Sequence, residues 1–233
     1  MCRRVSRYPG LKLSDFERAW LGRKWIEAGL GEHASVAAFA CVVLDLIRLG
    51  APPDLILGAI RAMGDEVEHA RLCFGIARDL NGAPASPGPM SVPNQFEHRE
   101  PEIILNSAIL EGCFEEVISA EFARVACDRA DDPRIRAVMD RIATDEARHA
   151  ELSWRVVEWI LQVHPELRRN ALATFAAGLE ARADIETGDD AMPENYGHLL
   201  GASRRHVREL TLDRVIRPRA RGLLGVASDA DMA

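Results

Sequence analysis

Two copies of one short motif, Asp-Glu-x-x-His, constrain the fold of this chain more than any other feature. The first copy contains Glu66 and His69, and the second contains Glu146 and His149. On an α-helix, residues three positions apart lie on the same face, about 5 to 6 Å apart, so each Glu and His pair can bind one metal ion. The repeated motif therefore predicts two helices that face a shared site.

Each motif follows another glutamate by about the length of a helical hairpin. Glu32 lies 34 residues before Glu66, whereas Glu111 and Glu115 lie 35 and 31 residues before Glu146. The stretch 32–40 (EHASVAAFA) can be aligned with 115–123 (EEVISAEFA). A repeated hairpin brings one set of ligands from each half to a pseudo-twofold site. The spacing leaves open whether Glu111, Glu115 or both belong to that site.

The surroundings of both motifs favour a buried site over a solvated polar helix face. Apolar residues recur at helical spacing around each motif, as expected for helices that face a core: Leu55, Ala59, Met63, Ala70 and Cys73 for the first, and Ile135, Met139, Ile142, Val156 and Ile160 for the second. Four buried carboxylates without compensating charge would be very costly. Two divalent cations would balance them, which favours a two-metal site.

Composition limits the class of protein. A chain of 233 residues is long enough for one well-filled domain, and its net charge of −7 argues against a nucleic-acid binder. The five cysteines form no CxxC pair and indicate reduced thiols in an intracellular protein. The longest apolar run, 36–44, is too short to span a bilayer, and no apolar stretch follows the N-terminal arginines. We expect a soluble cytoplasmic protein with no nucleic-acid or membrane partner.

Helix signals divide the chain into seven helical segments, and no strand pattern is present. A capping box at Ser14 and Glu17 opens a short N-terminal helix, which Gly29 and Gly31 are expected to break or kink. Further helices are expected at about 30–49, 53–80, 101–130, 133–164 and 166–183, with a last one from about 203. The Pro- and Gly-rich link 81–99 is long for a bundle and predicts a crossover to the opposite end.

These segments predict three regions: an N-terminal extension (1–29), a four-helix bundle (30–164) and a C-terminal helical extension (165–233). The last helix concentrates positive charge, with Arg204, Arg205, Arg208, Arg214, Arg217, Arg219 and Arg221. This pattern is typical of an exposed helix. The alternative interpretation is a docking patch for an acidic partner or an anionic substrate.

The complete ligand pattern resembles that of the ferritin-like di-iron carboxylate superfamily. Within it, the twice-repeated Glu and Asp-Glu-x-x-His signature is similar to that of di-iron oxygenases such as the p-aminobenzoate N-oxygenase and hydroxylase groups. The resemblance covers about residues 30–163. It implies an all-α, ferritin-like four-helix bundle with a long crossover between its second and third helices, and extra helices at both ends.

The resemblance also implies a ligand set. Glu66 and Glu146 would bridge two metal ions, with Glu32 as a terminal ligand and one imidazole on each ion. The full set is Glu32, Glu66, His69, Glu111, Glu115, Glu146 and His149. Metal-bound histidine usually donates its second ring N–H to a carboxylate, so Asp145 is expected to orient His69 and Asp65 to orient His149.

The implied activity is that of an O₂-activating di-iron oxidoreductase of the monooxygenase type, acting on a small molecule. Two iron ions are the expected cofactor, with manganese as the alternative because mixed carboxylate and imidazole ligands suit both metals. Other interpretations are a ferroxidase or peroxide-scavenging protein related to ferritin or rubrerythrin, and a non-catalytic metal-binding bundle. O₂ or peroxide is expected as co-substrate. An electron-donor protein and homo-oligomer formation are left open.

Overall fold

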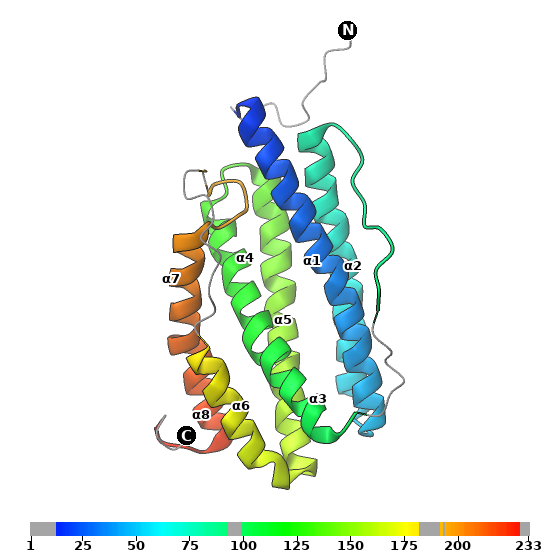
Figure 1. The fold of residues 1–233 in the computed structure, drawn as a ribbon, viewed down its shortest axis with the longest axis vertical. Helices are drawn as coiled ribbons and strands as arrows, with labels where there is room; N and C mark the ends of the chain where they lie inside the picture. Colours follow the sequence, from blue (N-terminus) through cyan, green and yellow to red (C-terminus); the bar gives the residue numbers. More distant parts are fainter. Residues whose placement is uncertain (1–12, 93–98, 182–191, 193, 229–233) are drawn as a thin grey trace.

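The computed structural model describes residues 13–92, 99–181, 192 and 194–228. Within these residues the chain forms helices and no strand, as the sequence predicts. The helices α1 (Asp15–Arg48) and α2 (Pro53–Asn81) form one hairpin. A second hairpin lies beside it and consists of a long rod, α3 to α4, followed by α5 (Pro133–Val163) (Figure 1). The molecule is therefore a helical bundle built on two hairpins.

The helix α1 is longer than the sequence pattern indicated. Its capping box is present, because the Glu17 amide donates to Ser14 Oγ and the Ser14 amide donates to the Glu17 carboxylate. The expected break at Gly29 and Gly31 does not occur. A Cβ at Gly29 would lie 3.1 Å from the Phe74 ring, so this glycine allows α1 and α2 to pack closely. The N-terminal segment and the first bundle helix are thus one continuous helix.

The rod of the second hairpin contains a π-helical section in its middle. It begins as α3 (Pro101–Ser107), widens in the π segment (Ala108–Glu116) and continues as α4 (Val117–Arg129). A π-helix bonds each residue to one five positions away, and such segments are rare. Side chains after the wider turns therefore point in directions that a 3.6-residue period does not predict.

The link between the hairpins runs along the length of the bundle. The helix α2 ends at the opposite end of the molecule from the start of α3, and the described part of the connection follows the outer side of α2 (Figure 1). Gly82 terminates α2 in a left-handed conformation with φ of 67°. This geometry explains why the Pro- and Gly-rich link is long.

The C-terminal part packs along the second hairpin. A 3₁₀ turn (Pro165–Leu167) leads into α6 (Arg168–Glu180), and the chain later forms α7 (Gly201–Thr211), a second π segment (Leu212–Ile216) and α8 (Arg217–Leu224). Ile216 and Ala220 are fully buried. Two arginines of this last segment contact the bundle itself: Arg208 donates to Glu115, and Arg219 pairs with Glu151.

Among the described helices, α1 alone is long and apolar enough to cross a membrane by length and composition. The longest uninterrupted apolar run, 36–44, is too short to reveal this property. In the structure α1 pairs with α2 and points Asp45 into the bundle, so the property by itself is weak evidence for a membrane span. Only 17% of the residues in its most apolar window are buried, and most of the others are partly buried against the bundle.

The hydrophobic core is divided into two clusters along the bundle axis. One cluster contains Trp25, Ile76, Ala126 and Ile135, and the other contains Leu46, Ala59, Ile118 and Ile160. On α2 and on α5, the Glu and His of the repeated motif lie between residues of the two clusters. The polar residues singled out by the sequence thus form a layer at mid-length, with apolar packing above and below.

Candidate metal centre

The polar layer brings six side chains from four helical elements together. They form two overlapping sets, Glu32, Glu66, His69 and Glu146 in one, and Glu66, Glu116, Glu146 and His149 in the other. In each set the potential ligand atoms lie within 4.8 Å of one another. Glu and His lie three positions apart in each motif, which places both side chains on the inward face of the helix. Buried glutamate and histidine groups therefore lie at distances suited to metal binding.

The two shared glutamates are oriented so that each faces both histidines. Glu66 Oε2 lies 3.7 Å from His69 Nδ1, and Glu66 Oε1 lies 3.1 Å from His149 Nδ1. Glu146 Oε1 lies 3.5 Å from His69 Nδ1, and Glu146 Oε2 lies 3.7 Å from His149 Nδ1. Each carboxylate thus presents one oxygen to each set, which is the arrangement that a bridging ligand requires.

The remaining two glutamates, Glu32 and Glu116, each belong to only one of the two sets. Glu32 Oε2 lies 3.6 Å from His69 Nδ1, and Glu116 Oε2 lies 3.7 Å from His149 Nδ1. Both are less buried than Glu66 and Glu146, with side-chain exposures of 18% and 19% against 2% and 6%. They lie at the rim of the layer.

Three buried atoms of the layer lack a hydrogen-bond partner among the described residues: Glu66 Oε2, His69 Nδ1 and His149 Nδ1. Buried polar atoms normally have a partner, so each exception needs an explanation. Both imidazoles leave the same nitrogen unsatisfied, and in both cases that nitrogen faces the carboxylates. The donor set and the unsatisfied atoms fit a pair of divalent cations.

The opposite nitrogen of each imidazole is held by an aspartate. His69 Nε2 lies 3.1 Å from Asp145 Oδ2, and His149 Nε2 lies 3.2 Å from Asp65 Oδ2. These are the pairs expected from the sequence, although their effect on a metal stays a prediction. Arg148 joins the two aspartates, donating to Asp145 Oδ1 and to Asp65 Oδ2, each at 2.8 Å. An aspartate that accepts from Nε2–H fixes the tautomer that leaves Nδ1 free to bind a cation.

The pKa values show how the layer balances its charge. Burial disfavours both imidazolium ions, but the surrounding glutamate carboxylates outweigh it and raise the pKa of His69 and of His149 to about 12. Burial also opposes the ionised form of Glu146, yet the neighbouring imidazoles of His149 and His69 lower its pKa to about 2. Burial raises the pKa of Glu32 to about 7 and that of Glu116 well above its usual value. The carboxylates thus need positive charge beside them, which protons or cations can supply.

The structure corrects the assignment of the carboxylate on the third helix. Neither Glu111 nor Glu115 joins a ligand set, and Glu116 takes that place. The Glu115 side chain is 57% exposed and accepts a hydrogen bond from Arg208 Nη2 at 2.9 Å. Glu111 lines a separate cavity. An α-helical period selected Glu111 and Glu115, whereas the π segment that ends at Glu116 changes which side chain faces inward.

The sequence contained one signal that could have identified Glu116. It is the second residue of the Glu115-Glu116 doublet that opens the internal repeat. A doublet offers two adjacent side chains about 100° apart on a helix, so any local change in winding decides which one points inward. Without knowledge of the π segment, the α-helical spacing selects Glu115 of this doublet instead of Glu116.

An open cavity of about 410 Å³ adjoins the polar layer between α1 and α4. Glu32, Glu116 and Glu146 form part of its wall, together with Trp25, Phe122 and His198. The two rim glutamates are therefore on the side from which a small molecule can approach.

Comparison of the chain with protein-family models, with curated proteins and with solved structures found no match.

Proposed function

We propose that this protein is a di-iron, O₂-activating oxidoreductase of the oxygenase type, built on a ferritin-like bundle and acting on a small molecule. One observation carries the proposal: Glu66 and Glu146 each direct one oxygen toward each of two histidine nitrogens that otherwise lack a partner. Carboxylate and imidazole ligands of this kind suit iron or manganese. Two ferrous ions held by these residues would supply the electrons and the open coordination positions needed to reduce O₂.

The chain's own residues would perform the other tasks of such an enzyme. Asp145 and Asp65 accept from Nε2–H and hold each imidazole with Nδ1 toward the layer. Arg148 holds the two aspartates together, and the apolar clusters above and below exclude water from the buried glutamates. Glu32 and Glu116, at the rim, can move with less disturbance of packing than Glu66 and Glu146. The cavity beside them supplies space for a substrate.

The proposal is tested by loading purified protein with two ferrous ions per chain without oxygen, then mixing it with O₂ and following the optical spectrum. We expect two ions to bind and a transient absorbance to form, whose decay is accelerated by an oxidisable organic molecule. Turnover of excess ferrous ion with accumulation of ferric mineral would instead support a ferroxidase. A protein that binds no metal, or whose binding is unchanged in Glu66→Ala and His149→Ala, would contradict any metal function.

A matched pair of variants tests the corrected ligand. Glu116→Gln removes a charged oxygen from the His149 set, so we expect one of the two ferrous ions to bind much more weakly. Glu115→Gln changes the neighbouring exposed carboxylate and should retain two ions. Equal stoichiometry and affinity in the two variants would show that Glu116 is not a ligand.

A further inference from the structure

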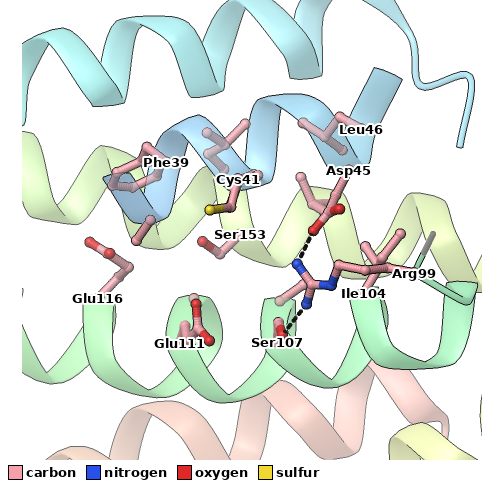
Figure 2. Close-up of a pocket in the computed structure, with 16 residues that line it drawn as sticks. Phe39, Cys41, Asp45, Leu46, Arg99, Ile104, Ser107, Glu111, Glu116 and Ser153 are labelled. Atoms are coloured by element: carbon pink, nitrogen blue, oxygen red, sulfur yellow. Dashed lines mark hydrogen bonds and ion pairs between the residues drawn. The ribbon is translucent and has the colours of Figure 1, made fainter. Parts of the chain in front are cut away.

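A second, smaller cavity lies between α1 and the π segment and has a volume of about 70 Å³ (Figure 2). Two of its lining residues, Ala38 and Glu111, are exposed and mark its mouth. Its inner wall consists of buried residues from one apolar cluster of the core: Phe39, Leu46, Ile104, Leu152 and Val156. The cavity therefore leads from the surface into the apolar interior of the bundle.

One end of this cavity reaches the candidate metal centre. Phe39 and Glu116 lie at that end, away from Arg99 and Asp45 (Figure 2). The Phe39 ring packs edge-on against the His149 imidazole, with 5.1 Å between ring centroids. Glu116 also lines the open cavity of about 410 Å³. Two cavities of different size thus border the same candidate ligand.

The charged groups at the other end of the small cavity already satisfy one another. Asp45 is buried, with Oδ1 bound by Arg48 at 2.7 Å and Oδ2 bound by Arg99. Arg99 also donates to Ser107 Oγ at 2.8 Å (Figure 2). This end is therefore poorly suited to bind a charged molecule.

The other polar side chains of the wall also offer little to a ligand inside the cavity. Ser153 Oγ donates to the His149 carbonyl at 3.0 Å, and Cys41 Sγ donates to the Ala37 carbonyl at 3.1 Å. The Glu111 side chain is exposed at the mouth, where solvent hydrates it. The interior of the cavity thus provides mainly apolar contacts, which favour an apolar occupant.

We propose that this cavity is the site through which O₂ enters the bundle and is held beside the metal centre, apart from the open cavity for the organic substrate. O₂ is small and apolar, and apolar cavities in protein interiors bind such molecules. A water molecule needs roughly 10 to 15 Å³ on the same measure, so a cavity of about 70 Å³ admits a diatomic gas. The inference rests on the proposed function for the use of O₂, whereas the binding of a small apolar gas does not depend on it.

The contrast between the two cavities supports this division. The open cavity has Glu32, Ser119 and Arg204 in its wall, beside Trp25 and Phe122, and so suits an organic molecule with polar groups. The small cavity lacks the space for such a molecule. Separate approaches would let O₂ reach the metal centre while the organic substrate occupies the open cavity.

The first test locates xenon, an apolar atom that stands in for O₂, by X-ray diffraction from crystals of the full chain pressurised with xenon. We expect xenon between Val42 and Ala108, in the small cavity. Ala108→Leu and Val42→Phe fill the cavity from the π segment and from α1, respectively, and each should lose this xenon site. Ala34→Leu, at an exposed position of α1 outside both cavities, should retain it. Absence of xenon from the original protein, or its retention in both filled variants, would overturn the proposal.

The second test uses the same variants loaded with two ferrous ions and mixed with O₂. Ala108→Leu and Val42→Phe should bind ferrous ion like the original protein, but their second-order rate constant for reaction with O₂ should fall several-fold. Ala34→Leu should keep the original rate constant. Filled variants that lose xenon yet react with O₂ at the original rate would show that O₂ enters elsewhere, which would overturn the proposal. Xenon binding by a chain that binds no ferrous ion would refute only the proposed function, and ferrous binding without a xenon site would refute only this inference.

Discussion

At the scale of single residues, the candidate site depends on which atom of each side chain faces inward. Each histidine turns Nδ1 toward the glutamates and Nε2 toward an aspartate, so the aspartate determines the position of the proton on the ring. The sequence could predict these partners, because Asp65 and Asp145 occupy the same position in both copies of the motif. It could not predict that Arg148 connects both aspartates, because an arginine on a helix surface is equally common without such a contact.

Asp145→Asn tests the role of this partner. Asparagine preserves the shape of the side chain but removes its charge, so His69 becomes a weaker ligand. We expect the affinity for ferrous ion to fall by about 10 to 100-fold with the stoichiometry unchanged, measured by anaerobic titration. Asp140→Asn, an exposed carboxylate of the same helix, serves as the control and should bind metal like the original protein. Similar affinities in both variants would exclude the proposed role.

At the scale of elements, the sequence predicted the long helices well where an α-helical period and a cap coincide. The expected starts at Pro53, Pro101 and Pro133 are confirmed, since proline at the first turn leaves no donor unsatisfied. The prediction was wrong at Gly29 and incomplete at the π segment. Both errors have the same origin, because these features depend on contacts between helices, and a local pattern does not contain them.

Gly112 illustrates this dependence and provides a prediction for the π segment. A Cβ at this position would lie 2.5 Å from the Cβ and Oγ of Ser153 on α5. We expect Gly112→Ala to lower the free energy of unfolding by about 1 to 3 kcal/mol in urea, because the two helices must move apart. Gly75→Ala is the control, since nothing lies within 4 Å of its added Cβ. It should keep or raise stability by about 0.5 to 1 kcal/mol, and an equal effect of both changes would refute the argument.

At the scale of the whole molecule, the C-terminal helices are packed as part of the bundle core. Ile216, Ala220 and Leu224 belong to the same apolar cluster as Leu46 and Ile160. The sequence indicated an appended helix, because arginines dominate its composition and conceal the apolar residues between them. A helix that is polar on most faces still buries a narrow apolar stripe when it has a partner surface.

Ile216→Ala tests whether this packing makes the chain one cooperative unit. The side chain is fully buried, so we expect a loss of about 2 to 5 kcal/mol in the free energy of unfolding. Circular dichroism and tryptophan fluorescence should report the same single transition, because the tryptophans lie in both apolar clusters. Val215→Ala, at an exposed neighbour, should change stability by less than about 0.5 kcal/mol. Two separate transitions would show that the C-terminal helices unfold independently.

The division of the core into two apolar clusters also coincides with the position of the cavities. Apolar packing stabilises each end of the bundle, while the level between them is occupied by charged and polar side chains. Both cavities reach Glu116 at this level. The layer that would hold the metals is thus also the level at which hollow space enters the bundle.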